Sequence, residues 1–469
     1  MTKKIVVLGG GVTGLSTAWK LSEHGADVLV LEKKGIVGGV SGTFSHGEYR
    51  LDYGPHKIYT QIPGVLDEYK TLLGADLNAI PKNQTIRVQG KYYNFPVKIQ
   101  QLLLGMNPLT AVKCGASYAA AIARKAIAPL PNDSYENYLR NRFGDVVYSM
   151  LFEQYAWKVW GDPKKLSADL ARKRISVPSL FELVKRVALG DQGEKELSAS
   201  TFFYPERGFQ EVSDKMVERI TNNGGRVVTG ATPTAIRHDG KAIIAVEYEA
   251  AGKKQSVEAS HVISTIPIGE LPPLFSPSAP ADVVAAGKAL KWRSIILVFM
   301  VVDKPRIMNE NWIFFPEADY AFNRVSEQKG FNDKMVPADK TVVCAEVTCD
   351  YLDEKWRASD AEMFERVIPG LEKSGLFKRE NVKEYFTVKL KDPYPVYDIG
   401  YEANLTKVIG YLDSIKGALT IGRMGLFNYN NTDHCIDMGR KAADYILSGK
   451  TLDAWQAERK KFDGYLIVD

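Results

Sequence analysis

Three observations predict that this chain has an α/β fold with two interleaved domains. Residues 5–32 read as strand, glycine-rich turn, helix and strand. Later segments return to this pattern, ending with an apolar strand at residues 418–421 and a helix after it. Between them, residues 293–302 and 341–348 are long apolar strands that suit an antiparallel sheet. We therefore expect a Rossmann-like domain in residues 1–52, 205–270 and 416–450, interleaved with a mixed α+β substrate domain in residues 53–204 and 271–415 that carries an antiparallel sheet and a helical lid around residues 98–200.

The first forty residues contain every part of a βαβ dinucleotide-binding unit. In order, these parts are an apolar strand at residues 5–8, Gly9, Gly11, Gly14, an amphipathic helix at residues 15–24 and a second strand at residues 27–31. The glycines allow a tight turn, a close approach of backbone N–H groups to a pyrophosphate, and packing of the helix on the strand. Glu32 ends the second strand, where its carboxylate can accept hydrogen bonds from a ribose. The sequence therefore predicts a bound dinucleotide.

A second pair of glycines indicates which dinucleotide this is. Gly38 and Gly39 follow Glu32 by a few residues. A nicotinamide enzyme needs no second phosphate loop there, whereas a long FAD lying across the sheet does; an ordinary surface turn is the alternative. At this point the sequence resembles the flavoprotein superfamily of amine oxidases, protoporphyrinogen oxidases and UDP-galactopyranose mutases, whose N-terminal signature has paired glycines here. The resemblance implies FAD. The absence of an attachment motif near the C-terminal segment predicts that it is held non-covalently.

Composition excludes several other classes of protein. The chain of 469 residues suits two or three domains, and its net charge of +5 with no basic run predicts no nucleic-acid partner. The four cysteines lack metal-ligand spacing and the six histidines are scattered, so we expect no structural metal. The first strand begins almost at the N-terminus, which leaves no room for a signal peptide. We expect a cytoplasmic protein, and the sequence leaves its oligomeric state open.

A rigid loop follows the first unit. Residues 42–51 read as a hairpin that leads to Gly54, Pro55 and His56. In the mutase branch a similar Gly-Pro-His passes beside the isoalloxazine, and the resemblance implies the same here. The other interpretation of His56 is a loop histidine that hydrogen-bonds the backbone. Tyr59, just beyond, is a candidate substrate contact.

The alanine-rich segment at residues 98–130 predicts a helix with basic flanks. It is too interrupted to span a bilayer, which needs about 20 apolar residues. It is a core or lid helix or, alternatively, a helix that lies on a membrane surface, so peripheral membrane contact stays open.

Further candidate substrate residues come from the middle of the chain. Trp157 and Trp160 share one helical face and either pack in the core or wall a substrate site. Their Lys-x-Trp-Gly context, with Arg174 after it, resembles the mutase branch. In that branch an arginine placed like Arg293 holds the substrate diphosphate, and a Tyr-Pro-Val loop like that of Tyr394 and Tyr397 faces the substrate. A solvated strand-end charge is the other interpretation of Arg293.

The C-terminal segments complete the expected cofactor site. Superfamily members return to the cofactor sheet in mid-chain and end with a glycine-rich turn and a helix that contacts the flavin, and both features are similar here. Thr432 or Asp433 is a good N-cap for the helix at residues 433–447. The expected cofactor residues are Gly9, Gly11, Val12, Thr13, Gly14, Glu32, Lys33, Gly38, Gly39, Gly54, Pro55, His56, Pro233, Ser264, Thr265, Gly422, Arg423, Asn431, Thr432 and Asp433.

These observations rank two functions. The first is an FAD-dependent oxidoreductase, like the protoporphyrinogen and amine oxidases, in which a small molecule transfers a hydride to flavin N5. The alternative is a redox-neutral enzyme like the UDP-galactopyranose mutases. In that branch a second arginine that binds the diphosphate follows shortly after an Arg-Ile pair, whereas here Ser176, Val177 and Pro178 follow Arg174 and Ile175. The alternative therefore ranks second. A flavin-binding scaffold without turnover is a third, less favoured reading. The candidate catalytic residues are His56, Arg293, Tyr394 and Tyr397, and the substrate is left open among a phosphorylated sugar, a porphyrin and a lipid.

Overall fold

The computed structural model describes residues 4–97, 105–175, 200–465 and 467. Its first layer is a sheet of eight strands whose centre is parallel, in the order β19, β12, β1, β2 and β9. An antiparallel extension, β10 and β11, continues from β12, and β13 adds a further edge. The strands are β1 (Lys4–Leu8), β2 (Val28–Glu32), β9 (Arg226–Thr229), β10 (Ala231–His238), β11 (Ile243–Ala250), β12 (Lys253–Ser264), β13 (Phe275–Ser276) and β19 (Ala418–Thr420).

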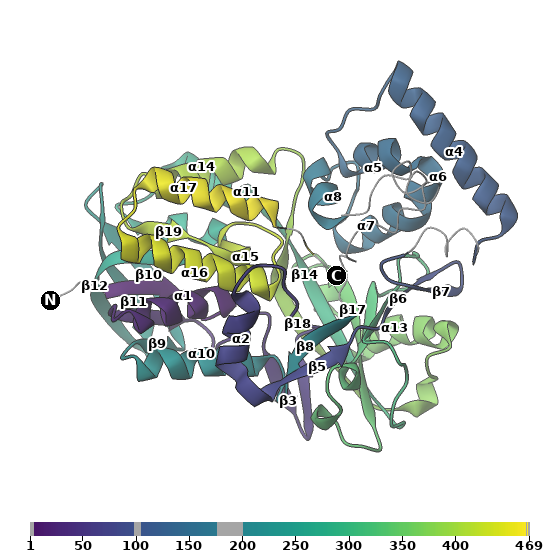
Figure 1. The fold of residues 1–469 in the computed structure, drawn as a ribbon, viewed down its shortest axis with the longest axis horizontal. Helices are drawn as coiled ribbons and strands as arrows, with labels where there is room; N and C mark the ends of the chain where they lie inside the picture. Colours follow the sequence, from purple (N-terminus) through teal and green to yellow (C-terminus); the bar gives the residue numbers. More distant parts are fainter. Residues whose placement is uncertain (1–3, 98–104, 176–199, 466, 468–469) are drawn as a thin grey trace.

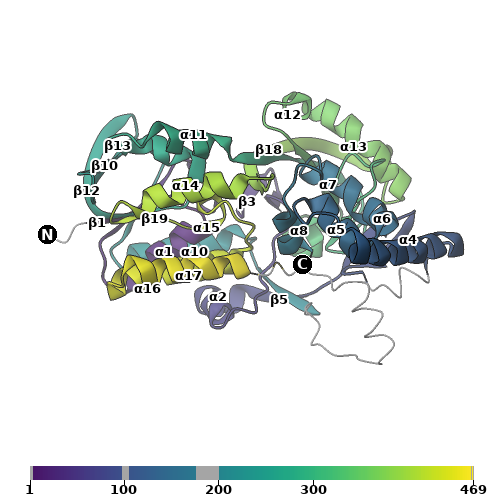
Figure 2. The same ribbon diagram turned by 90° about the horizontal axis from the view of Figure 1, so that it is seen from above.

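Helices cover both faces of this sheet, which explains its apolar strands. Val7 and Val30 pack into one core and Leu8 and Leu31 into the other, so each strand is buried on both sides. Figure 2 shows α1, α10, α16 and α17 on one side and α11 and α14 on the other. Their bounds are α1 (Val12–Glu23), α10 (Gln210–Asn222), α16 (Thr432–Ser448), α17 (Leu452–Lys461), α11 (Ala281–Ala289) and α14 (Tyr401–Asp413), with α2 (Val65–Leu73) against α10 and α16. The α/β fold and its Rossmann-like layer are confirmed.

The second layer is a sheet of seven strands, mostly antiparallel, in the order β18, β14, β17, β16, β15, β6 and β7. The strands are β18 (Val382–Val396), β14 (Lys291–Val302), β17 (Thr341–Cys349), β16 (Arg324–Glu327), β15 (Trp312–Phe314), β6 (Gln84–Val88) and β7 (Lys91–Asn94). Helix α13 (Asp360–Ser374) packs against β18 and β14, with the short α12 (Glu354–Arg357) before it. The predicted antiparallel sheet is therefore present and also includes the hairpin of β6 and β7.

One segment predicted as a loop belongs to this sheet. Residues 392–398 were expected to form a loop, but β18 continues to Val396 and pairs Tyr394 with Arg293. The register shifts here, and Asp392 adopts a positive φ of 56°. Because β18 is an edge strand, the missing N–H groups of Pro393 and Pro395 do not interrupt the sheet.

Helices α4 to α8 form a separate layer beside the second sheet (Figure 1). They are α4 (Pro108–Ile127), α5 (Tyr135–Phe143), α6 (Asp145–Tyr148), a π-helical turn (Ser149–Glu153), α7 (Gln154–Val159) and α8 (Ala168–Arg174). Residues 98–104 and 176–199, which the predicted lid includes, lie outside the described residues. Two small ribbons complete the fold: β3 (Thr43–His46) with β4 (Tyr49–Asp52), and β5 (Leu77–Pro81) with β8 (Thr201–Pro205). Within the described ranges, none of the helices combines the length and apolar character needed to cross a membrane.

Candidate functional site

A cavity of about 370 Å³ lies where the two sheets and the helical layer meet. Seventeen of the predicted site residues line it: Gly9, Gly11, Val12, Thr13, Glu32, Gly38, Gly39, Gly54, Pro55, His56, Trp160, Arg174, Thr265, Tyr394, Arg423, Asn431 and Thr432. They come from segments more than 400 residues apart in the chain. The cavity thus has one end on the first sheet and another between the second sheet and the helical layer.

The first end is formed by the turn between β1 and α1. The Gly38 N–H donates to the Gly10 carbonyl at 2.8 Å, which holds the second glycine loop beside the first. The two loops lie in contact, since a Cβ at Gly39 would stand 3.4 Å from the Gly11 Cα, and the positive φ of 64° at Gly39 favours glycine there. Gly11 is the N-cap of α1 and offers no side-chain cap, so the helix presents backbone N–H groups to this end. Such a terminus suits an anionic phosphate.

Glu32 is held in a fixed orientation at this end. Its Oε2 accepts a hydrogen bond from the Gly10 N–H at 2.7 Å, and its Oε1 accepts one from the Lys34 N–H at 2.8 Å. Each carboxylate oxygen can accept a further bond, so Glu32 can bind hydroxyl groups while both oxygens stay anchored. This is the donor and acceptor chemistry that a ribose requires.

A second helix N-terminus reaches the same cavity. The N-cap of α16 is Asn431, one residue before the predicted Thr432 and two before the alternative Asp433. Its N–H donates to His434 Nδ1 at 3.1 Å. Asn431 and Thr432 line the cavity, whereas Asp433 is buried outside it. Helix α16 packs along α1, so two positive helix ends lie near one ligand space. The glycine cradle, Glu32 and the two helix ends together fit an anionic dinucleotide.

His56 lies on the cavity wall between the two ends. Its Nδ1 is 3.0 Å from the Gly54 carbonyl oxygen, and the same ring lines the cavity. Burial lowers the pKa of His56 to about 4, and the positive charges of Arg324 and Arg423 act in the same direction. The imidazole is therefore neutral at neutral pH, with Nδ1 protonated toward Gly54 and Nε2 an acceptor.

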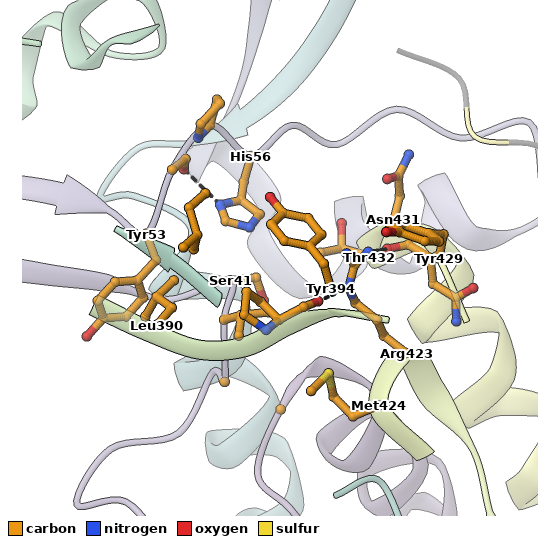
Figure 3. A pocket seen from close by; sticks show the side chains of 18 of the residues that line it. Ser41, Tyr53, His56, Leu390, Tyr394, Arg423, Met424, Tyr429, Asn431 and Thr432 are labelled. Atoms are coloured by element: carbon orange, nitrogen blue, oxygen red, sulfur yellow. Dashed lines mark hydrogen bonds between the residues drawn. The ribbon is translucent and has the colours of Figure 1, made fainter. Parts of the chain in front are cut away.

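Arg423 lies against two tyrosine rings at the second end of the cavity. Its Cζ is 5.2 Å from the ring centroids of both Tyr394 and Tyr429, and the two rings are inclined by 25° to each other. The guanidinium donates to the carbonyls of Pro393 and Asn430, each at 2.9 Å. Figure 3 shows Tyr394 between His56 and Arg423. In the part of the chain that the structure describes, no carboxylate forms an ion pair with Arg423, so its charge faces the cavity uncompensated.

Other groups at this end were not predicted from the sequence. Arg324 and Glu346 line the cavity as a bidentate pair, with distances of 2.7 and 3.0 Å. Tyr429 accepts a hydrogen bond from Trp160 Nε1 at 2.6 Å, and Arg174 Cζ lies 5.4 Å from its ring centroid. Tyr429 stands two residues before the predicted Asn431, and this nearness in the sequence could have identified Tyr429 as a site residue. Arg324 and Glu346 had none, because only the pairing of β16 with β17 brings them together.

The structure does not bring the remaining predicted residues to the described cavity lining; these are Gly14, Lys33, Tyr59, Trp157, Pro233, Ser264, Arg293, Tyr397, Gly422 and Asp433. Trp157 points outward with 54% of its surface exposed. Arg293 forms an ion pair with Asp350 and donates to the Lys158 and Val159 carbonyls at 3.4 and 3.3 Å. Tyr397 is fully buried, and its hydroxyl donates to Asn428 Oδ1 at 2.8 Å.

Some of these residues support the site from outside. A side chain at Gly14 would stand 2.1 Å from the Gly9 carbonyl oxygen, so glycine is required for α1 to pack on the turn. Gly422 has a φ of 84° and lies against Thr13. Pro233 pairs with Tyr248 in the antiparallel extension, and Lys33 is exposed. Ser264 is fully buried at the end of β12.

Comparison with known proteins finds a family and solved structures that are similar to this chain. The profile of the family described as flavin containing amine oxidoreductase matches residues 12–446. Tobacco mitochondrial protoporphyrinogen oxidase is 28% identical over 197 residues, which cover 39% of this chain and only 37% of that enzyme. A crystal structure of reduced UDP-galactopyranose mutase superposes with a TM-score of 0.82 at 21% identity, covering 96% of this chain and 95% of the other. Cyclohexylamine oxidase from Brevibacterium oxydans superposes with a TM-score of 0.67 at 16% identity, covering 96% and 99%. The two structures share the fold.

Proposed function

Because the chain belongs to the family of flavin-containing amine oxidoreductases, we propose that it is an FAD-dependent oxidoreductase whose small-molecule substrate carries an anionic group. The observation that carries the substrate class is the charge at the second end of the cavity, where we assign to the substrate Arg423, which the sequence predicted as a cofactor residue. Among the described residues, no carboxylate pairs with Arg423 there, and Glu346 is already paired with Arg324. An anionic group is stabilised by that wall, whereas an ammonium group is repelled by it.

The cofactor is proposed to bind non-covalently along the first end of the cavity. The N-termini of α1 and α16 and the loop of Gly38 and Gly39 would hold its phosphates, and Glu32 would bind a ribose. When bound, the flavin ring accepts or donates a hydride at N5. The family's fold and this donor set together support FAD.

The chain's own residues supply position and charge. Arg423 is oriented by its bonds to Pro393 and Asn430, so it offers its remaining N–H groups to a ligand without rearrangement. His56 stays neutral, so it is able to accept a hydrogen bond without adding charge to the wall. Tyr394 and Tyr429 contribute aromatic faces and hydroxyl groups. We propose no general base among them, because removal of a hydride by a flavin does not require one.

The test is reduction of the purified flavoprotein under anaerobic conditions by a matched set of anionic, neutral and amine substrates. We expect bleaching of the flavin absorbance with anionic compounds and none with cyclohexylamine. Arg423→Gln should raise the KM for the anionic substrate roughly tenfold or more, since a charge-assisted bond contributes about 1.5 to 3 kcal/mol. Arg366→Gln, at an exposed arginine of α13 that is not part of the described cavity lining, is the matched control. Reduction by amines and not by anions would overturn the proposal.

A redox-neutral mutase is a second candidate, and the stacked arrangement at Arg423 favours it. Arg423 lies against the rings of Tyr394 and Tyr429, and Arg174 lies against the ring of Tyr429. Two guanidinium groups and two phenol hydroxyls are a donor set suited to a phosphorylated sugar. The predicted diphosphate contact of Arg293 gives it no support, since Arg293 is paired with Asp350 outside the described lining. Isomerisation of UDP-galactose only after reduction with dithionite, with no net flavin turnover, would favour this candidate.

A further inference from the structure

We propose that helix α4 docks the protein on the surface of an anionic lipid bilayer. The proposal concerns the outer face of α4, defined here as the exposed apolar positions from Leu109 to Ile127. It is independent of the reaction in the cavity. Figure 1 shows α4 at the outer edge of the helical layer, and Figure 2 shows the same position from above.

The outer face of α4 is apolar over its whole length. Its large side chains are strongly exposed: Leu109 by 63%, Val112 by 68%, Ile122 by 49% and Ile127 by 84%. The other exposed apolar positions are Gly115, Ala116, Ala119, Ala120, Ala123 and Ala126, and the two exposed polar positions in this span are Lys113 and Lys125. With a rotation of about 100° per residue, the ten apolar positions fill roughly half of the helix circumference. Soluble monomers rarely expose a continuous apolar surface of this kind without a binding role.

The orientation of this face is fixed by the opposite side of α4. Cys114 and Ala121 are buried there, and α4 packs against α5 and α6. Ser117 Oγ accepts a hydrogen bond from the Val146 N–H at 3.1 Å, and Arg124 donates to both oxygens of Asp145 at 3.3 Å. A side chain at Gly144 would come within 3.0 Å of the Ser117 backbone, so the corner between α5 and α6 fits closely against α4. The apolar face is therefore presented outward by specific contacts.

Charge identifies the partner as an anionic surface. Lys113 and Lys125 are exposed, and residues 105–130 contain no aspartate or glutamate. At a rotation of about 100° per residue, Lys113 stands next to one edge of the apolar face and Lys125 lies roughly 60° beyond the other edge. Apolar residues between lysine flanks are the pattern of a helix that lies in a membrane interface. A second copy of the same face would bring like charges together, which disfavours self-association. The helix is roughly 30 Å long and does not meet the requirements for crossing a membrane, so it would lie in the interface plane.

The experiment is flotation of the full-length holoprotein with vesicles of phosphatidylcholine, with and without phosphatidylglycerol. We expect binding to the anionic vesicles that weakens with salt and is small on neutral ones. Val112→Glu with Ile127→Glu should abolish binding. Lys113→Gln with Lys125→Gln should weaken it roughly 30-fold, at about 1 kcal/mol per lysine. Leu452→Glu, at an exposed leucine on α17, is the control and should bind as the native protein does.

Flavin absorbance and the thermal midpoint of each variant report whether the fold is intact. Failure of the native protein to bind anionic vesicles overturns the proposal. So does a concentration-dependent dimer that is broken by the Val112 and Ile127 substitutions while vesicles have no effect, because the face would then join two copies. Equal binding to neutral and anionic vesicles overturns the assignment of an anionic partner.

Discussion

Glu346 of β17 holds Arg324 of β16 by two hydrogen bonds, at 2.7 and 3.0 Å, in the wall of the cavity. Glu346 is buried, and Arg324 keeps 20% of its side chain exposed toward the cavity. Among the described lining residues, Glu346 is the only acidic side chain at the second end, and its negative charge is neutralised by Arg324. The pair therefore leaves the wall with positive charge, since Arg423 has no ion-pair partner among the residues that the structure describes.

We predict that Glu346→Gln destabilises the protein by about 3 kcal/mol, because it leaves a charged arginine without its partner. The free energy of unfolding from urea titration is the measurement. Glu354→Gln is the matched control, since that glutamate pairs with Arg366 at the surface with 75% of its side chain exposed, and it should cost less than about 1 kcal/mol. Equal effects of the two changes would contradict the role given to the buried pair.

We predict that Glu32→Gln weakens FAD binding roughly tenfold. The amide would lose the charged acceptor for the ribose, and one of its atoms would become a donor facing the N–H of Gly10 or Lys34. Titration of the apoprotein with FAD, followed by flavin fluorescence, measures the change. Glu23→Gln, at the exposed end of α1, should bind FAD as the native protein does. Unchanged affinity in Glu32→Gln would remove Glu32 from the cofactor site.

Two glycines in helices are predicted to respond to alanine in opposite ways. Gly14→Ala would place a methyl group 2.1 Å from the Gly9 carbonyl oxygen, so it should cost about 3 kcal/mol or more and loosen FAD. Gly410→Ala meets nothing within 4 Å near the end of α14 and should stabilise by about 0.5 to 1 kcal/mol. Thermal unfolding of both variants checks the pair. A tolerated Gly14→Ala would mean that α1 is free to move away from the turn.

The part of the fold that depends on local pattern was predictable from the sequence. The apolar run before Gly9 and the position of Glu32 identify the βαβ unit, because each part has a fixed spacing. The extension of β18 through Tyr394 was missed, since prolines normally end a strand and only an edge position tolerates them.

The second end of the cavity could be predicted only in part, because tertiary contacts decide it. Nothing near Arg293 in the sequence shows that Asp350 will pair with it, and nothing near Arg324 indicates Glu346. The charges that remain unpaired depend on which strands lie side by side, and these strands are about 20 to 60 residues apart in the chain. Tyr394 was found by its motif, whereas Tyr429 needed the fold to bring it to Arg423.

Asp52 and His56 are predicted to give opposite pH dependence to stability. Burial raises the pKa of Asp52 from 3.8 to about 6, although Thr43, Tyr204 and the Phe209 N–H bond to its carboxyl group. Since the folded protein holds this proton more tightly, the stability from Asp52 is full below about pH 4 and is lost as the pH rises through about 6. His56 has a pKa lowered from 6.5 to about 4, so its contribution rises over the same window.

Replacing each residue should therefore change the slope of stability against pH in opposite directions. Asp52→Asn removes the stability loss that ionisation of Asp52 causes as the pH rises. The change in unfolding free energy from pH 4 to pH 7, measured with urea, should therefore be more positive in this variant than in the native protein, by up to about 3 kcal/mol. His56→Gln removes the stability gain that deprotonation of His56 gives over this window, so the change in unfolding free energy from pH 4 to pH 7 should be less positive than in the native protein. Parallel slopes for the native protein and Asp52→Asn would show that Asp52 titrates alike in the folded and unfolded states.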